Sequence, residues 1–482
     1  MNWQAVYPVL PEMALLVMAC VVALTDLWVP GKDRIVTYCI AQTALGVIAI
    51  GQLWYFYEGA TYYAMQRMVV ADPMGHLLGL FATLAMMTTL VYTRPYAVSR
   101  DLLKGELFTL SMFSLLGILV MLAANNFLVV YLGLELMSLS LYALVAMRRD
   151  DTGATEAAMK YFVLGALASG FLLYGLSMMY GATGSLEISE VFRAIGTGRI
   201  NRAVLVLGTV FVVAGLGFKL GAVPFHMWVP DVYHGAPTAV TLLIGTAPKL
   251  AAFAFVMRLL VEALGMQQLL AEWQQMLVLL AVASLAIGNI TAIAQTNLKR
   301  MLAYSTISHM GFLLLGILSG TVEGFGAAMY YTVIYVLMAL GTFGMIMLLS
   351  RQGFEAQNLE DFKGLNQRDP WYAFIMMLLM FSMAGIPPTM GFWAKLFVLQ
   401  AVLSAGYVWL AVVAVLFSFV GAFYYLRVVK LMYFDAPTDA APIGPHGDVR
   451  VLMSVNGLAV LVLGLAPGAL LAVCERAIHL SL

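Results

Sequence analysis

The stretch GFKLGAVPFHMWVPDVYHGAPTAV, residues 217–240, places a lysine, two histidines, an aspartate and three prolines between long apolar segments. A proline inside a helix removes a backbone donor and clashes with the carbonyl one turn earlier, so Gly221 and Pro224 are predicted to break a helix. In a bilayer the freed backbone groups need partners, so a break persists where it is buried in protein or lines water. The stretch therefore predicts an interrupted membrane helix that carries polar groups.

The rest of the chain is strongly apolar. Of its 482 residues, 62% are hydrophobic and only 10% are charged, against roughly 25% charged in a soluble domain. This composition predicts an all-α polytopic membrane protein. The formal net charge is +0, so no charged surface for nucleic acid is expected. The cysteines lack a CxxC spacing, so no metal or iron–sulfur site is expected; they are Cys20, Cys39 and Cys474.

Apolar runs long enough to cross a bilayer recur along the whole sequence. A hydrocarbon core of about 30 Å needs roughly 20 residues per helix, which predicts about 14 transmembrane helices. We expect them to begin near Val9, Ile35, Asp72, Glu106, Asn126, Thr155, Arg202, Pro237, Trp273, Met301, Glu323, Pro370, Ala405 and Val451.

Basic residues are distributed unevenly among the connections between these spans. Connections after odd-numbered spans carry Lys32, Arg34, Arg94, Arg100, Lys104, Arg148, Arg149, Lys299, Arg300, Arg351, Lys363, Arg368, Arg427, Lys430 and Arg450. Connections on the opposite side carry only Arg67, Arg193, Arg199, Arg202 and Arg476. Because short cytoplasmic loops carry an excess of Lys and Arg, both termini are predicted to face away from the cytoplasm.

A second predicted break lies five spans after the first. In MAGIPPTMGFWAKL, residues 383–396, Gly385, Pro387 and Pro388 interrupt the twelfth span. Repeats with an odd number of helices must lie in opposite orientations, so helices 4–8 and 9–13 are predicted to be inverted five-helix repeats, with helices 7 and 12 broken. The predicted units are a three-helix segment (1–105), two repeats (106–265 and 266–433), and a polar linker with helix 14 (434–482). Packing kinks remain an alternative explanation of the breaks.

Several ionisable residues are predicted to lie well inside spans. They are Glu135, Lys160, Lys219, Lys249, His309 and Lys395. A charged group at the bilayer centre costs at least about 2.5–3.5 kcal/mol, so such residues are candidates for a functional site. Arginine effectively never releases its proton, whereas burial lowers the pKa of a lysine towards neutrality. The choice of lysine therefore predicts a proton relay. Arg258 is expected to reach the interface from a helix end.

Structural roles remain open for several of these residues. Lys160 lies near the start of its span and would reach the interface, while Lys219 and Lys395 would cap carbonyls freed at the breaks. His226 is either a proton shuttle to the aqueous face or a hydrogen-bonded loop residue. His309 is either a relay or a satisfied core histidine. Acidic residues near span ends are assigned to capping, namely Glu12, Asp26 and Asp72.

Four segments together resemble a known family. They are LGLELMSLSLYALVA around Glu135, MKYFVLGALASGFLLYG around Lys160, the stretch at 217–240 and MAGIPPTMGFWAKLFVL. As a set they resemble the antiporter-like membrane subunits of respiratory complex I, and the resemblance covers nearly the whole chain. Lysine rather than glutamate at Lys395, and the lack of a long carboxyl-terminal helical arm, favour the N branch of that family.

The resemblance implies a proton channel made of two half-channels joined by a polar axis in the middle of the membrane. It implies that Glu135 modulates Lys160 and Lys219, and that Lys249 connects towards Lys395. It also implies a bacterial cytoplasmic membrane, with other complex I subunits as partners. Flavin, iron–sulfur clusters and quinone are expected in those partners, with no redox centre in this chain.

Three functions are compatible with these residues. The first is proton translocation driven by quinone reduction in other subunits. The second is a subunit of a multisubunit cation/proton antiporter. The third is a scaffold whose buried charges only pair for helix packing, a contribution of about 0.6 kcal/mol per pair. They differ in whether Lys249 and Lys395 are needed for proton movement.

Overall fold

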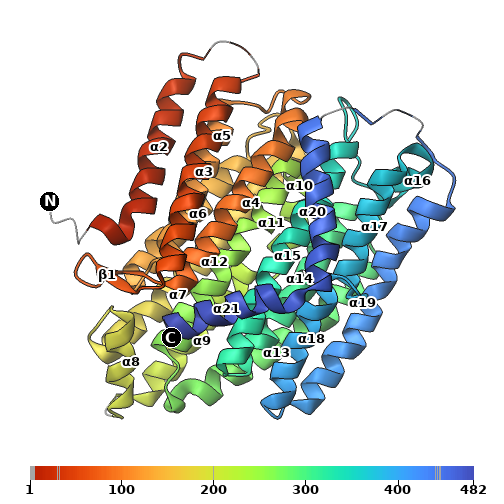
Figure 1. Ribbon diagram of the computed structural model, residues 1–482. Helices are drawn as coiled ribbons and strands as arrows, with labels where there is room; N and C mark the ends of the chain where they lie inside the picture. The colour runs from red at the N-terminus through yellow and green to blue at the C-terminus, as the bar shows by residue number, and fades with distance from the viewer. Residues whose placement is uncertain are drawn as a thin grey trace.

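The structure is a computed structural model, and helices long enough to cross a membrane make up most of it (Figure 1). The structure describes residues 6–29, 31, 33–198, 200–439, 441, 443–444 and 447–482. Within these residues 13 helices have the length and apolar character of a span, and two shorter apolar helices, α17 (Pro370–Ala384) and α18 (Met390–Ser404), follow one another along the chain. The prediction of a helical polytopic membrane protein is therefore confirmed. Lys32 and Arg199, which entered the loop-charge prediction, lie outside the described residues.

The described helices and strands are η1 (Tyr7–Val9), α2 (Leu10–Asp26), α3 (Ile35–Glu58), β1 (Tyr62–Ala64), β2 (Val69–Ala71), α4 (Pro73–Val98), α5 (Gly105–Leu122), α6 (Phe127–Val145), α7 (Thr152–Thr183), α8 (Ile188–Gly196), α9 (Arg202–Leu220), α10 (Trp228–Gly235), α11 (Thr238–Gly245), α12 (Ala247–Val256), η2 (Met257–Ala263), α13 (Gln267–Ile293), α14 (Leu298–Leu318), α15 (Val322–Leu349), η3 (Leu359–Phe362), α16 (Leu365–Arg368), α17 (Pro370–Ala384), α18 (Met390–Ser404), α19 (Val408–Phe434), α20 (Gly447–Leu465) and α21 (Pro467–Ser481).

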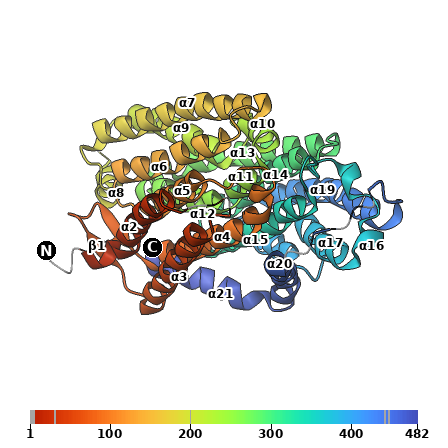
Figure 2. The ribbon, with the colours of Figure 1, turned by 90° about the horizontal axis from the view of Figure 1, so that it is seen from above.

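The helices of the two predicted repeats meet in the middle of the molecule. Seen from above, α6 to α9 lie towards one end and α17 and α19 towards the other (Figure 2), while α11 and α12 pack against α15 and α13 packs against both α9 and α14. The central helices are the most buried: every residue of α11 and α12 is buried, and most of α15 is. Polar groups carried by these helices are therefore surrounded by protein.

Three segments differ from the sequence prediction. The eighth span is not continuous, because α11 ends at Gly245 and α12 begins at Ala247, directly before Pro248. The last span also divides: α20 ends at Leu465, and α21 begins with Pro467 and runs across the bundle (Figure 1). Proline is favoured at the first position of a helix, where its missing N–H has no partner to lose. A short antiparallel hairpin of β1 and β2 was not predicted either.

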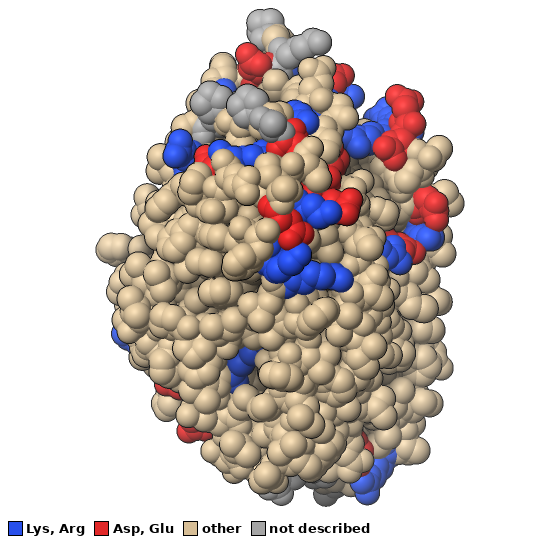
Figure 3. All heavy atoms as spheres, turned by 90° about the vertical axis from the view of Figure 1, so that its right-hand side faces the viewer, with Lys and Arg blue, Asp and Glu red and all other residues tan. Residues whose placement is uncertain are grey.

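Charged side chains gather at one end of the molecule. In Figure 3 clusters of both signs extend from the upper end of the visible face to about its middle, while the lower part is largely uncharged, with a few separate charged residues. A largely uncharged surface is what contact with lipid requires, because charges at that depth are costly.

Candidate functional site

The first broken helix ends in a tight carboxyl-terminal cap. α9 stops at Leu220, and Gly221 follows with φ +80°, a conformation that glycine adopts without strain from a Cβ. The N–H groups of Gly221 and Ala222 donate to the carbonyls of Phe218 and Gly217. The chain then continues as a turn, which includes a cis Val223–Pro224 peptide, before α10 begins at Trp228. The carbonyl of Leu220 is left for a partner from outside the helix.

Lys249 supplies that partner. Its Nζ donates to the Leu220 carbonyl oxygen at 2.9 Å, and the residue is 1% exposed. The break in the eighth span creates this geometry, since Lys249 lies in the first turn of α12, directly after Pro248. The sequence predicted a buried Lys249 but not the additional break at Thr246. The signal for that break was the Pro248–Lys249 pair in the middle of a span.

Lys219 faces the same region from the end of α9. Its Nζ donates to Oγ of Ser138 on α6 at 2.9 Å. A cavity of about 20 Å³ is lined by both Lys219 and Lys249, which is room for about one water molecule. Glu135 lies one turn before Ser138 on α6, and its Oε1 has no hydrogen-bond partner among the described residues. The structure therefore brings two amines of the predicted set to one cavity, with the Glu135 carboxylate one turn along α6 from the hydrogen-bond partner of Lys219.

Lys160 differs from its prediction. Its side chain is 43% exposed rather than buried, because its position on α7 faces outward. Its carboxylate contacts are Glu156 and Asp231, each at 2.8 Å, and not the predicted Glu135. Asp231 also accepts from Arg300 at 2.8 Å and so joins α7, α10 and α14. Asp231 lies in the stretch 217–240 but was not among the predicted site residues. Its position between prolines of the broken segment was the available signal.

A charged cavity opens beside this pair. It has a volume of about 470 Å³, and its lining includes Lys160, Asp231, His234, Lys299 and Glu355. Lys299, counted from sequence as a loop charge, is only 2% exposed and donates to the Ala236 carbonyl at 2.7 Å.

Glu355, in the connection after α15, closes one side of this cavity. Burial raises the pKa of the Glu355 carboxyl, but Lys299, Arg100 and a hydrogen bond from Thr238 outweigh it, so the net pKa lies below its usual value. Glu355 forms an ion pair with Arg100 at 3.0 Å. The mouth of the cavity is thus held by fixed ion pairs.

The second broken helix repeats the cap of the first. α17 stops at Ala384, and Gly385 follows with φ +85°. The N–H groups of Gly385 and Ile386 donate to the carbonyls of Ser382 and Phe381, and the turn includes a cis Pro387–Pro388 peptide. The freed carbonyls again face a lysine.

Lys395 is that lysine. Its Nζ donates to the carbonyls of Met383 and Ala384 at 3.1 and 2.8 Å, and to Oγ of Ser418 on α19 at 2.9 Å. The residue is 9% exposed. An ammonium at the carboxyl end of a helix interacts favourably with the helix dipole. Capping, which the sequence left open as the structural explanation of Lys395, is thus observed, and it does not exclude a second role.

His309 is fully hydrogen-bonded within a ring of tyrosines. Nδ1 lies 2.6 Å from the Tyr331 hydroxyl and Nε2 lies 3.1 Å from the Tyr425 hydroxyl. Tyr425 continues to Ser305 on the same helix as His309. These hydroxyls were not singled out from sequence, because tyrosine is common in apolar helices and no spacing marked them.

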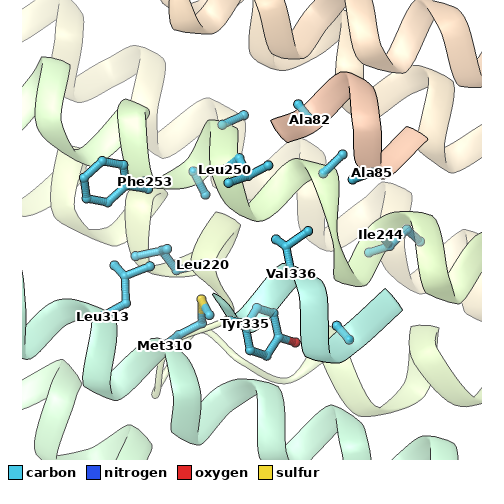
Figure 4. Close-up of a cluster of buried hydrophobic side chains, with 14 of the residues drawn as sticks. Ala82, Ala85, Leu220, Ile244, Leu250, Phe253, Met310, Leu313, Tyr335 and Val336 are labelled. Atoms are coloured by element: carbon cyan, nitrogen blue, oxygen red, sulfur yellow. The ribbon is translucent and has the colours of Figure 1, made fainter. Parts of the chain in front are cut away.

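Apolar side chains surround Leu220 at the first break. Leu220 is drawn among Leu250, Phe253, Met310 and Leu313 in Figure 4, and all five belong to one buried hydrophobic cluster. His226, the remaining predicted residue, is half-buried in the turn after the first break, and its Nδ1 has no partner among the described residues. Within the part of the chain that the structure describes, the polar groups therefore form separate stations, each a group of hydrogen-bonded residues, rather than one continuous chain of contacts.

Arg258, expected from the sequence to reach the interface from a helix end, is buried within the protein. Its side chain is 2% exposed and its Nη2 lies 2.6 Å from Oδ2 of Asp72, while Nη1 lies 2.8 Å from Glu262. Asp72 does cap α4, accepting from Gly75 at 2.8 Å, as predicted. Burial of the arginine is possible because two carboxylates compensate its charge.

Together, the fold and these sites define a class: a polytopic helical membrane protein with two interrupted helices whose free carbonyls are held by buried lysines. Residues 124–421 match the family described as NADH:quinone oxidoreductase/Mrp antiporter, TM. A relative named NADH-quinone oxidoreductase subunit N, from Herminiimonas arsenicoxydans, is 61% identical and covers 99% of each chain. Another relative of the same name, from Polaromonas naphthalenivorans, is 58% identical and covers 99% of this chain and 98% of its own length. The chain belongs to the NADH-quinone oxidoreductase subunit N family.

Solved structures agree with this assignment. A chain of respiratory complex I from Thermus thermophilus with bound aureothin is 30% identical, with a TM-score of 0.82 over 96% of this chain and 98% of its own. A chain of the Mrp complex from Dietzia sp. has a TM-score of 0.85 at 20% identity, covering 99% of this chain and 97% of its own. The second likeness shows the fold alone, and the first confirms the resemblance read from the sequence.

Proposed function

We propose that this chain moves protons across the bacterial cytoplasmic membrane as a membrane-arm subunit of NADH:quinone oxidoreductase. The observation that carries the proposal is the seating of Lys249 and Lys395 on the free carbonyls of the two breaks. A lysine in such a place can exist with or without its added proton, whereas an arginine cannot. A change in the surrounding charge would then shift the proton between neighbouring stations.

The route begins at the charged cavity beside Lys160 and Asp231. From there the proton passes to Lys219 and Lys249, with Glu135 setting the local charge. His226 is a second connection to the aqueous face. His309 and its tyrosines carry the proton on towards Lys395. The apolar layer around Leu220 has to admit water during transfer, and its dry state prevents leakage between turnovers.

The driving reaction lies in other subunits. Quinone reduction, flavin and iron–sulfur clusters are assigned to partner chains of the complex, with this chain held among neighbouring membrane-arm subunits. Both termini are assigned to the non-cytoplasmic side. The chain is divided into four units, which are residues 1–105, 106–265, 266–433 and 434–482.

The decisive experiment replaces Lys249 by alanine in the assembled complex. We expect electron transfer coupled to proton movement to fall by at least about tenfold, equivalent to about 1.4 kcal/mol. Lys363→Ala is a matched control, because Lys363 is a loop lysine whose only ion pair among the described residues is with Glu360. Wild-type turnover with an undiminished proton yield in Lys249→Ala would reject the proposal.

A cation/proton antiporter subunit is the second candidate. The fold shared with the Mrp complex chain favours it, since one architecture hosts different functions. Purification in mild detergent separates the two: the first proposal expects flavin and iron–sulfur subunits in the same complex. Isolation without redox partners, together with sodium-dependent proton flux, would support the antiporter instead.

A further inference from the structure

Two buried polar atoms face one small cavity at the hairpin end of the N-terminal helices, away from the lysines. The cavity has a volume of about 10 Å³ and is lined by Glu12 on α2, Gln52 on α3, and Asp72 and His76 beside and on α4. His76 is 5% exposed. Among the described residues, neither Oε2 of Glu12 nor Nε2 of His76 has a hydrogen-bond partner. Buried polar groups nearly always have partners, so this pair requires an explanation.

The other imidazole nitrogen determines what Nε2 can bind. Nδ1 of His76 lies 2.7 Å from Oε1 of Gln52. An amide oxygen only accepts, so Nδ1 carries the hydrogen and Nε2 of the neutral ring is an acceptor. The ring is held in place by Tyr55, whose ring stacks on it with centroids 4.8 Å apart. Gln52 packs against Gly79, where a Cβ would lie 3.0 Å from Cδ of Gln52.

Glu12 presents a second acceptor to the same space. An ionised carboxylate has only acceptor oxygens, so the cavity is bordered by two acceptors and needs a donor between them. A water molecule has two hydrogens and meets that need. The cavity volume is close to the minimum for one water.

We propose that Glu12 and His76 form a proton-exchange site that holds one water molecule between Oε2 of Glu12 and Nε2 of His76. In the deprotonated state the water donates one hydrogen to each acceptor. A proton taken up from solvent is held on Oε2 or Nε2, and the water then accepts from that group. Release of the proton to solvent restores the first state, so no other reactant is consumed.

The charges around the site suit proton uptake. On the side of η2, Arg258 is shared between Asp72 and Glu262. On the aqueous side, Glu58 accepts hydrogen bonds from two tyrosine hydroxyls. One cation among three carboxylates leaves a surplus of negative charge. The titratable groups around the cavity are Tyr7, Tyr55, Glu58, Asp72, Arg258 and Glu262.

The site also lies at the end of the helix that carries Lys249. η2 directly continues α12, and Arg258 on η2 binds Asp72, whose backbone carbonyl accepts from the His76 N–H at 3.0 Å. A change of charge at His76 therefore alters the electrostatic surroundings of Asp72 and Arg258, at the end of the segment that continues the Lys249 helix. The N-terminal three-helix segment, which the proposed route does not use, gains a chemical role.

Infrared difference spectroscopy on the resting, assembled complex tests the site. After a step to acidic pH we expect a carboxylic C=O band that is missing in Glu12→Gln and shifts in heavy water. His76→Asn should move the band, because asparagine keeps a donor towards Gln52 but offers no acceptor at Nε2. Glu190→Gln is the matched control, since Glu190 is an exposed carboxylate that pairs with Arg193 and does not line the cavity, and it should leave the band unchanged.

The proposal would be overturned if the frequency of the band changed neither in His76→Asn nor in heavy water. It would also be overturned if no band of Glu12 appeared in the difference between acidic and alkaline pH. If a variant does not assemble, isotope-labelled glutamate in the wild-type complex gives the heavy-water reading without a substitution. The measurement needs no turnover, so its outcome is independent of whether the chain translocates protons.

Discussion

The two broken helices share a backbone and differ in where their charges come from. Each ends at a glycine with positive φ, and each offers carbonyls to a buried ammonium. At the first break the ammonium comes from the next span, as Lys249; at the second it comes from the same span, as Lys395. Two residues before the glycine stands Lys219 in one helix and Met383 in the other. The geometry of the carbonyl site, rather than a sequence position, is what the two halves have in common.

The consequence is an unequal number of amines. The first break has Lys219 and Lys249 beside one cavity, whereas at the second only Lys395 among the described lysines contacts the freed carbonyls. A station with two amines can pass a proton between them, while a station with one must exchange it with a different group. His309 and its tyrosines fit that requirement.

The largest effect is expected from removing the single amine. Lys395→Met should lower proton translocation by at least about tenfold, or about 1.4 kcal/mol, and by more than Lys219→Met, which leaves Lys249 in place. The measurement is proton yield per electron pair in vesicles containing the assembled complex. Normal pumping by Lys395→Met would favour the scaffold function.

The caps themselves provide the next test. Alanine at φ near +80° costs roughly 1–2 kcal/mol, so Gly221→Ala and Gly385→Ala should lower thermal stability of the complex to a similar extent. A Cβ at Gly385 would lie 2.9 Å from Cδ of Lys395, whereas at Gly221 it would meet Val229. Only Gly385→Ala should therefore also displace an amine and reduce pumping directly. Equal pumping losses in the two variants would contradict this difference.

A smaller effect is expected at the entrance. Asp231→Asn leaves Lys160 and Arg300 without their shared carboxylate. Because both pairs are partly exposed, we expect a loss of about 1 kcal/mol, or roughly fivefold in rate. The loss should shrink in high salt, which screens exposed charges. Turnover rate against ionic strength measures this, with Glu190→Gln as a control whose pair with Arg193 lies away from the cavity. An effect independent of salt would argue against an electrostatic entrance.

The smallest effect is expected at the serines. Ser418→Ala and Ser138→Ala each remove one hydrogen bond to a lysine. Lys395 keeps two carbonyl partners, so Ser418→Ala should cost only about 0.5 kcal/mol, the low end for a hydrogen bond. Ser138→Ala should cost more, because no other hydrogen bond of the Lys219 ammonium is described. The ratio of the two pumping rates checks the order.

Much of the fold could be predicted from the sequence because each break carries its own local signal. Gly221 with Pro224, and Gly385 with Pro387, mark the two interruptions without any knowledge of neighbours. The break at Thr246 was missed, since Pro248 alone fits a kinked or an interrupted helix equally well. The ion-pair partners of Arg258 were missed for the opposite reason: Asp72 and Glu262 are recognisable only once the start of α4 and η2 are side by side.

The candidate site, too, was predictable from the sequence only in part. Deep lysines stand out because charge is costly in a bilayer, and so Lys249 and Lys395 were found. Lys160 was predicted to be buried but is exposed, because hydropathy measures depth along a helix and not the direction in which a side chain points. Tyr331 and Tyr425 carry no charge and no distinctive spacing, so only their convergence on His309 reveals them.

The sequence by itself determined that the chain spans a membrane, where two of its helices break, and that Lys249 and Lys395 are buried, since all three depend on hydropathy and local backbone chemistry. The tertiary structure decided which carbonyl each lysine binds, which carboxylate each cation meets, and which polar atoms remain unpaired. Those outcomes depend on distances between helices far apart in the chain, and packing alone sets these distances.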